Sequence, residues 1–345
     1  MKLKGKITKI LANFYYVQDT ESKTWECFSR SRLLKEGKLL FVGDEVEIEI
    51  SSLSQGVIVD LLNRKNKIIK PPIANIDQVF VIFSTCEPEF DIYNLDRYLS
   101  YISYELPKEK VAICINKMDL KRVNISENYK NTGYEVYYVS ALTQEGLDSV
   151  WNALVNKTTV FTGPSGVGKS SLIKALVPEQ DIKIGSLSAI KQGKHITRNI
   201  QLISVEYKGK RGFLVDTPGF TQFSFAGLKP QRLLSTFKDL SALSCSFKNC
   251  LHNGEEGCAV VGLDNLELIS KARYESYLKM LAELSSGVVY GTKEESKIKT
   301  VGGKTENRNE KKKILPKLGQ NMRIKSRKKE KQELLKFQEE ETNDF

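Results

Sequence analysis

At the middle of the sequence stands Gly163-Pro164-Ser165-Gly166-Val167-Gly168-Lys169-Ser170. It fits the pattern G-x-x-x-x-G-K-[ST], in which a glycine-rich backbone curls so that successive N–H groups point at phosphate oxygens. The flanking residues support this interpretation, because Thr158 to Phe161 predict a short buried strand and Lys169 to Val177 an amphipathic helix. Strand, loop and helix in this order favour a nucleotide phosphate site over an ordinary glycine-rich turn.

The side chains of this loop have separate expected roles. Lys169 is expected to reach the β- and γ-phosphates and to act in catalysis, and the Ser170 hydroxyl to ligate Mg²⁺. The predicted phosphate-side contacts are Thr162, Gly163, Pro164, Ser165, Gly166, Val167, Gly168, Lys169, Ser170 and Ser171.

The composition predicts a globular, cytoplasmic protein without membrane association. Of its 345 residues, 40% are hydrophobic and 28% charged, with no run of 18 apolar residues and no apolar leader behind Met1. The formal charge of +11 favours a polyanionic partner, although a basic tail alone can produce it. Six cysteines in a chain of this length do not indicate a disulfide scaffold.

Residues 1–68 contain short alternating segments separated by polar turns, which predict a small closed barrel, best interpreted as an OB-fold. Basic and aromatic residues alternate within this region and would suit an RNA-binding face; they are Arg30, Arg32, Lys35, Lys38, Phe28, Tyr15 and Tyr16. Solvated charges around core aromatics explain the same pattern equally well. The basic stretch from Asn63 to Pro72 is expected to be a linker.

Residues 69–225 predict an α/β domain in which a buried strand leads into Asn116-Lys117-Met118-Asp119. A carboxylate at Asp119 can accept hydrogen bonds from the N1–H and the exocyclic amine of guanine, whereas adenine offers no such pair of donors. Asn116 would support the base edge, and Lys117 would lie over the base. The next strand ends in Ser140-Ala141-Leu142, where the backbone loop is expected to contact guanine. The combined features predict a GTP site.

A second phosphate-side motif follows at Asp216-Thr217-Pro218-Gly219, where Asp216 is expected to hold Mg²⁺ through water and the Gly219 N–H to sense the γ-phosphate. The first switch is expected within Ile184 to Asn199. Thr197 is the preferred Mg²⁺ ligand there, with Ser186 and Ser188 as competitors. Because the guanine motif precedes the phosphate loop, the domain is predicted to be a circularly permuted P-loop GTPase.

A cysteine cluster follows, with the spacing Cys245-x4-Cys250-x-His252-x5-Cys258. Three thiolates and one imidazole form a closed tetrahedral set for one structural zinc ion. The alternative is a loop with buried free cysteines. Helical apolar spacing on both sides predicts a small helical zinc-binding domain over residues 226–290.

Taken together, the barrel, N-K-M-D, G-P-S-G-V-G-K-S, D-T-P-G-F and the cysteine spacing resemble the small ribosomal subunit biogenesis GTPase RsgA family over residues 1 to about 290. The resemblance implies an OB-fold, a permuted GTPase domain and a zinc-binding domain. It also implies GTP hydrolysis to GDP and phosphate, stimulated by the small ribosomal subunit during its late maturation, with ribosomal RNA as a partner. We expect the chain to act as a monomer.

The resemblance also bears on catalysis. Where many GTPases place a water-orienting Gln after D-x-x-G, this chain has Phe220, which cannot hydrogen-bond through its side chain. The family carries a His-Thr-Thr type motif in its first switch. His195 matches its proposed catalytic histidine, Ile196 departs from it, and the Mg²⁺ role therefore falls on Thr197. The alternative is that His195 is a loop histidine that only contacts RNA.

Two other classes of function remain open. Phe220 motivates an RNA-binding assembly factor that uses GTP mainly as a conformational switch with little turnover. An ATP-dependent enzyme is the second alternative, and Asp119 argues against it. Residues 291–345 predict a disordered basic tail, in which Lys311 to Lys331 holds ten Lys and Arg residues and a single acid, Glu330. Such a tail favours phosphate contacts, or serves only solubility.

Overall fold

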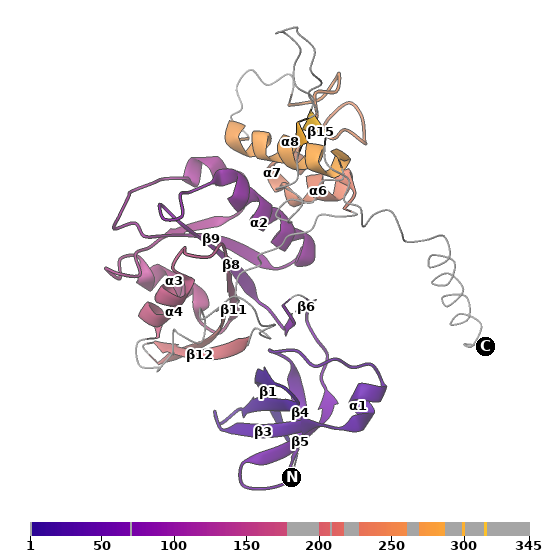
Figure 1. Ribbon diagram of the computed structural model, residues 1–345, viewed down its shortest axis with the longest axis vertical. Coiled ribbons are helices and arrows are strands. Elements are labelled where there is room, and N and C mark those ends of the chain that lie inside the picture. The colour runs from indigo at the N-terminus through magenta and orange to yellow at the C-terminus, as the bar shows by residue number, and fades with distance from the viewer. Residues whose placement is uncertain are drawn as a thin grey trace, which may run out of the picture. The chain divides into compact units, whose positions relative to one another are not determined.

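The computed structural model describes residues 2–69, 71–177, 200–207, 209–216, 228–260, 269–286, 299–300 and 314–315 (Figure 1). The chain divides into two units, Met1–Leu284 and Ser285–Phe345. In the second unit, the described residues are Ser285 and Ser286, which end α8 (Lys271–Ser286), and two short antiparallel strands, β14 (Lys299–Thr300) and β15 (Ile314–Leu315). The predicted basic tail otherwise lies outside the described residues.

The first part of the chain forms a closed five-stranded barrel. Its strands are β1 (Lys2–Leu11), β2 (Phe14–Asp19), β3 (Thr24–Ser29), β4 (Glu45–Ile50) and β5 (Gln55–Leu61), with α1 (Ser31–Lys35) between β3 and β4. They follow the order β1-β2-β3-β5-β4, and β4 pairs back to β1. Closure leaves no free strand edge. Alternate residues fill the interior, among them Ile7, Val17, Ile48 and Ile58, which are fully buried. The predicted OB-like barrel is confirmed.

The basic stretch after the barrel is folded onto its neighbours, in contrast to the expected linker. Arg64 Nε and Nη2 each lie 2.6 Å from a carboxylate oxygen of Asp44, which is wholly buried. Further along, β6 (Lys67–Ile68) pairs with β7 (Ile73–Ala74), and Ile68 is buried in the core of the following domain. The Pro-Pro and Lys-rich composition suggested a linker, but the buried side chain of Ile68 anchors the segment.

The second domain is built on a six-stranded segment of sheet. Its strands are β8 (Gln78–Ser84), β9 (Lys110–Asn116), β10 (Glu135–Tyr138), β11 (Thr158–Thr162), β12 (Gln201–Tyr207) and β13 (Lys210–Asp216). Their order is β10-β9-β8-β11-β13-β12, parallel except that β12 runs antiparallel to β13. Every residue of β8 and β11 is buried, as expected where helices cover both faces.

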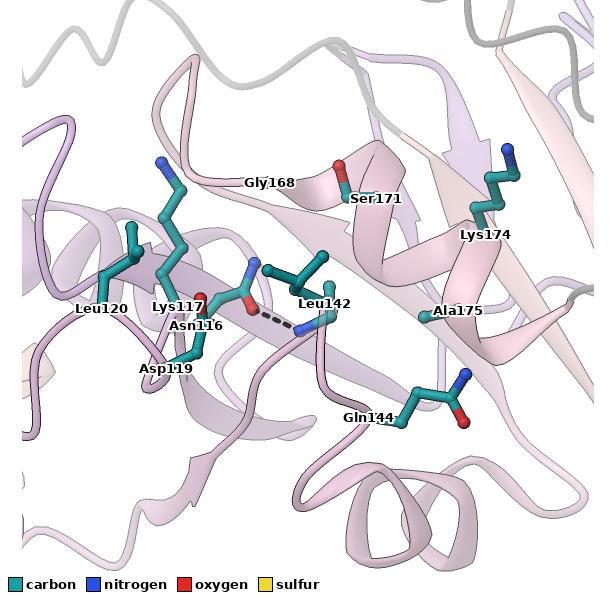
Figure 2. Close-up of a pocket in the computed structure, with 11 residues that line it drawn as sticks. Asn116, Lys117, Asp119, Leu120, Leu142, Gln144, Gly168, Ser171, Lys174 and Ala175 are labelled. Carbon is teal, nitrogen blue, oxygen red and sulfur yellow. Dashed lines mark hydrogen bonds between the residues drawn. The ribbon is translucent and has the colours of Figure 1, made fainter.

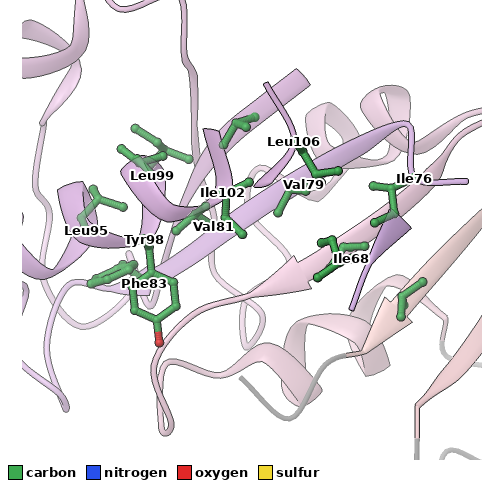
Figure 3. Packing of buried hydrophobic residues seen from close by; sticks show 14 of the residues in the cluster. Ile68, Ile76, Val79, Val81, Phe83, Leu95, Tyr98, Leu99, Ile102 and Leu106 are labelled. Carbon is green, nitrogen blue, oxygen red and sulfur yellow. The ribbon is translucent and has the colours of Figure 1, made fainter. Parts of the chain in front are cut away.

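The helices of this domain bury separate cores on the two faces of the sheet. The helix α2 (Ile92–Glu105) packs Leu95, Leu99 and Ile102 against Val79 and Val81 of β8 (Figure 3). On the other face, α3 (Leu147–Leu154) and α4 (Lys169–Leu176) cover the alternate residues of the same strands. A short 3₁₀ turn, η1 (Ser126–Tyr129), lies between β9 and β10.

The order of these strands confirms the predicted permutation. β9, which leads into Asn116, precedes β11, which leads into the glycine-rich loop, yet both flank β8 in one parallel sheet. The carboxyl ends of parallel strands meet at one edge, whatever their order in the chain. Both motifs therefore lie at the same edge of the sheet.

A small helical unit follows β13. It contains α6 (Pro230–Thr236), α7 (Lys238–Ser241) and α8 (Lys271–Ser286), and its core includes Leu233, Phe237, Leu240 and Tyr277. The unit contacts α2 through Thr236, whose hydroxyl lies 2.5 Å from that of Ser100. Among the residues described above, no helix has both the length and the hydropathy needed to cross a membrane.

Candidate nucleotide and metal sites

The glycine-rich loop runs from the end of β11 to the first turn of α4. Its backbone leaves no room for side chains at two points: a Cβ on Gly163 would lie 2.0 Å from the carbonyl oxygen of Ile82, and one on Gly168 would lie 2.5 Å from Asn116 Nδ2. Lys169 Nζ donates to the carbonyl oxygens of Gly163 at 2.9 Å and Pro164 at 2.6 Å. The ammonium group therefore lies against the backbone at the start of the loop.

Asn116 joins three loops at the carboxyl edge of the sheet. Its side chain is 1% exposed. Oδ1 accepts a hydrogen bond from the Ala141 N–H at 3.1 Å, and Nδ2 donates to the Val167 carbonyl at 3.0 Å. One amide thus holds the predicted guanine-reading segment, the loop after β10 and the glycine-rich loop at fixed distances from each other.

The carboxylate of Asp119 is oriented by a neighbouring hydroxyl. Ser140 Oγ donates to Asp119 Oδ1 at 2.5 Å and accepts from the Thr143 N–H at 3.0 Å. Met118 is buried and its N–H donates to the Val139 carbonyl, which fixes the Asn116–Asp119 segment to the chain that follows β10. Asp119 therefore presents a fixed acceptor pair next to the loop that carries Ala141.

These residues line one pocket of about 660 Å³, which is within the range of small-molecule sites. Figure 2 shows the segment that carries Asn116, Lys117 and Asp119 on one side and α4, with Ser171 and Lys174, on the other. The complete lining is Asn116, Lys117, Asp119, Leu120, Ala141, Leu142, Gln144, Gly168, Ser171, Lys174 and Ala175.

The pocket brings together seven of the residues predicted from the sequence, Leu142 included, and four others were missed. Leu120, Gln144, Lys174 and Ala175 belong to no motif, although each lies within five residues of one. The remaining predicted residues lie outside this lining. Thr162, Gly163 and Val167 are buried, Ser165 and Gly166 are exposed, and Pro164, Lys169 and Ser170 are half-buried.

The cysteine cluster also comes together. One ligand atom from each of Cys245, Cys250, His252 and Cys258 lies within 4.8 Å of all the others. His252 Nδ1 is 3.4 Å from the sulfur atoms of both Cys245 and Cys258. Four atoms at about 2.3 Å from a central ion lie roughly 3.8 Å apart in a tetrahedron, so the sites are close to this spacing, with Cys245 Sγ 4.0 Å from Cys258 Sγ. Burial lowers the pKa of His252, which favours the neutral imidazole that a metal requires. The set fits a metal ion.

Three residues hold the metal-binding loop from outside the ligand set. The carboxylate of Glu255 accepts hydrogen bonds from the N–H groups of Leu251 at 2.9 Å and Asn253 at 2.6 Å. From α8, the Tyr274 hydroxyl donates to the His252 carbonyl at 2.7 Å, and the Tyr277 hydroxyl donates to Leu251. Such outer contacts orient the ligands themselves.

Family models match two parts of the chain. The model of the RsgA GTPase family matches residues 61–226, and that of the RsgA N-terminal domain matches residues 4–58. A protein named small ribosomal subunit biogenesis GTPase RsgA, from Alkaliphilus metalliredigens, is 38% identical over 83% of this chain and 99% of its own length. Its counterpart from Bacillus pumilus is 36% identical over 81% of this chain and 97% of its own. The chain belongs to the RsgA GTPase family.

Two solved structures resemble the RsgA-family chain along most of their length. YjeQ from Thermotoga maritima has a TM-score of 0.71 at 30% identity and covers 83% of this chain and 99% of its own. YloQ, described as a circularly permuted GTPase, has a TM-score of 0.67 at 33% identity and covers 83% and 96%. The chain therefore has the circularly permuted GTPase fold, and its membership of the RsgA GTPase family makes it a GTP hydrolase.

Several predicted site residues of this RsgA-family chain lie outside the described residues. They are His195, Thr197, Ser186, Ser188, Gly219 and Phe220. Asp216 is placed by its backbone alone, as the last residue of β13 opposite Phe161 of β11. The structure therefore describes the guanine side of the site and the glycine-rich loop.

On the barrel, the described cations of the predicted set are paired with carboxylates. Arg30 pairs with Glu49 at 3.2 Å, Arg32 with Glu36 at 2.6 Å and Lys38 with Glu36 at 3.0 Å. Tyr15 packs against the barrel core, and the Tyr16 hydroxyl donates to Glu26. Phe28 is 45% exposed and its ring lies 4.7 Å from that of Phe14. Of the predicted set, Phe28 is the aromatic most available for stacking; the side chain of Lys35 lies outside the described residues.

Proposed function

We propose that this GTPase binds the small ribosomal subunit and acts in its late maturation, hydrolysing GTP to GDP and phosphate with turnover that the subunit stimulates. The observation that carries the proposal is Asn116, whose amide joins the guanine-reading segment and the glycine-rich loop into one pocket. The curated relatives named small ribosomal subunit biogenesis GTPase RsgA support the ribosomal part.

In the proposed nucleotide complex, guanine lies against Asp119, Ala141 and Lys117, and the phosphates lie along the backbone from Gly163 to Ser171. Lys169 would exchange its two carbonyl acceptors for phosphate oxygens, which offer it full negative charge. Mg²⁺, which supplies charge neutralisation at the phosphates, would be held by Ser170 and Thr197 directly and by Asp216 through water. The Gly219 N–H would contact the γ-phosphate.

Water activation is assigned to His195 in this proposal, because Phe220 offers no polar side-chain atom at the usual position. The histidine is expected to act once the ribosomal subunit orders the first switch. His195→Ala should abolish subunit-stimulated turnover while GTP affinity stays within about twofold of the original. Unaffected stimulated turnover would remove His195 from catalysis.

The three-cysteine, one-histidine cluster is proposed to hold one structural zinc ion. All four positions are occupied by protein ligands, so no coordination site is left for a substrate or water. The ion would stabilise the loop that Glu255, Tyr274 and Tyr277 already position.

Ribosomal RNA is the proposed macromolecular partner, reached by the barrel and by the basic residues between Lys311 and Lys331. Because the proposed partner is ribosomal, we propose that the protein acts in the cytoplasm, as a monomer. The proposed domains are residues 1–68, 69–225 and 226–290, followed by a basic tail at 291–345; these boundaries remain predictions.

The deciding experiment measures phosphate release with GTP or ATP, in the presence and absence of purified small subunits. The proposal expects slow release from GTP alone, multiple-turnover release with subunits, and none above background from ATP. Phe220 motivates one second candidate, a factor that uses GTP as a conformational switch. Tight subunit binding with GTP but only a single turnover would favour that candidate.

A further inference from the structure

The segment that reads guanine is bonded to a residue that belongs to no nucleotide-binding motif. Thr85 follows the last residue of β8 and is 1% exposed. Its N–H donates to the Asn116 carbonyl at 3.1 Å, and its hydroxyl donates to the Lys117 carbonyl at 2.9 Å. Thr85 is therefore attached to two consecutive residues of the Asn116–Asp119 segment.

The Lys117 carbonyl is the point on which the turn that presents Asp119 closes. It also accepts a hydrogen bond from the Leu120 N–H at 3.0 Å, so Met118 and Asp119 are the two central residues of a four-residue turn. Lys117 itself has a φ of +65°, a left-handed conformation that is strained for a residue with a side chain. The Lys117 carbonyl accepts from both the Leu120 N–H and the Thr85 hydroxyl. Two donors fix its direction more firmly than the hydrogen bond of the turn would alone.

The loop that follows β8 also contacts the side chain of Lys117. The Lys117 ammonium group donates to the carbonyl of Glu87, and Ser84 Oγ donates to the carbonyl of Pro88 at 3.0 Å. Pro88 also lies beside the glycine-rich loop, because a Cβ on Gly166 would be 3.4 Å from its Cδ. The residues from Ser84 to Pro88 thus contact both the base side and the phosphate side of the proposed nucleotide site.

We propose that Thr85 is a positioning residue for guanine specificity, which acts by fixing the turn that aims the Asp119 carboxylate at the base. The inference rests on the proposed guanine site. Asp119 distinguishes guanine by accepting two hydrogen bonds, and the second requires correct alignment of both carboxylate oxygens. Loss of the Thr85 hydroxyl lets the turn relax, so the second hydrogen bond weakens before the first.

The test compares GDP with IDP, whose hypoxanthine base lacks the exocyclic amine, by equilibrium titration of the full-length chain. Thr85→Val removes the hydroxyl at nearly constant volume. It should weaken GDP by about threefold to tenfold, the usual effect of one hydrogen bond, and IDP by less. The preference for GDP over IDP should therefore shrink. Thr85→Ser keeps the hydroxyl and should restore that preference.

Thr132→Val is the matched control, because Thr132 is also buried and its hydroxyl also donates to a carbonyl, that of Tyr129 at 2.6 Å, away from the pocket. It should leave the GDP to IDP ratio unchanged. If Thr85→Val is poorly folded, Thr85→Ala removes the same hydroxyl with a smaller side chain. Equal weakening of GDP and IDP, or no weakening, overturns the inference. Failure of the unmutated chain to bind GDP would instead overturn the proposed guanine site.

Discussion

Arg273 is expected to be the most sensitive single position for the stability of the chain outside the two sites. Its guanidinium is 2% exposed and is shared between two carboxylates. Nε and Nη2 donate to the two oxygens of Asp239 on α7, at 2.8 and 3.0 Å, while Nη1 donates to Asp96 on α2. Arg273 therefore ties the helical unit to the GTPase domain.

Arg273→Met keeps most of the buried volume but leaves two carboxylates without their cation. Breaking a buried ion pair in this way costs about 3 to 5 kcal/mol, because the remaining charge has no compensating partner. The methionine also loses the stacking of the guanidinium on the Tyr129 ring, whose centroid lies 4.8 Å away. Urea unfolding at neutral pH should show a loss of this size.

Burial of Asp96 determines the pH dependence of this cluster. Loss of solvent raises the pKa of Asp96 from 3.8 to about 6, although Arg273 opposes the rise; the second carboxylate, Asp239, adds a smaller increase. Because the folded state holds this proton more tightly, the contribution of Asp96 to stability is complete below about pH 4. It is lost as the pH rises through 6. At about 1.4 kcal/mol per pH unit, this difference in pKa corresponds to about 3 kcal/mol.

Asp96→Asn removes the surplus charge, so its unfolding free energy should exceed the original by an amount that grows as the pH rises from about 4 to 7 and is constant above that. The same substitution should recover part of the loss in Arg273→Met. Arg211→Met is the control, because Arg211 pairs with Glu206 on the surface at 3.1 Å and should cost less than about 1 kcal/mol. A difference between the original and Asp96→Asn that does not vary with pH would refute the argument, as would an Arg273→Met loss no larger than that of the control.

Three further predictions concern the nucleotide site, the metal and the tail. Gly168→Ala should weaken GDP by more than tenfold, because its Cβ would meet Asn116 Nδ2, whereas Gly133→Ala, with a similar φ but open space, should leave GDP affinity unchanged; titration of both variants decides this. Removing zinc with a chelator should unfold the helical unit first, and unchanged thermal stability after stoichiometric removal would contradict it. Deleting residues 300–345 should flatten the salt dependence of small-subunit binding, and an identical slope would exclude the tail from the interface.

Sequence reasoning reached the nucleotide site because both of its motifs follow buried parallel strands. Hydrophobic runs placed β9 and β11, and the edge at which such strands end is fixed by the fold and not by chain order. The cysteine cluster was equally accessible, since all four ligands lie within one short stretch and their chemistry is distinctive. Local spacing was sufficient in each case.

Residues that act across the fold were beyond this reasoning. Thr85 has the composition of an ordinary strand end, and only its contact with the Lys117 carbonyl, 32 positions away, gives it a role. Arg30, Arg32 and Lys38 show a second limit, because a pattern of positive charges does not reveal the carboxylates with which they pair. Charge counts describe what a surface contains, while pairing decides how much charge remains for a polyanion.

Arg273 shows why burial of a charge is the hardest property to predict from sequence. A single arginine in an amphipathic helix is normally solvated, and nothing in α8 indicates otherwise. Its burial depends on Asp96, 177 positions earlier and on the far side of the permuted domain in the sequence. A buried cation is tolerated only when acceptors surround it, and here one acceptor comes from the GTPase domain and the other from the helical unit. Arg273 therefore stabilises the association of the two. The permuted order leaves the helical unit attached after β13, and this cluster holds that unit against α2.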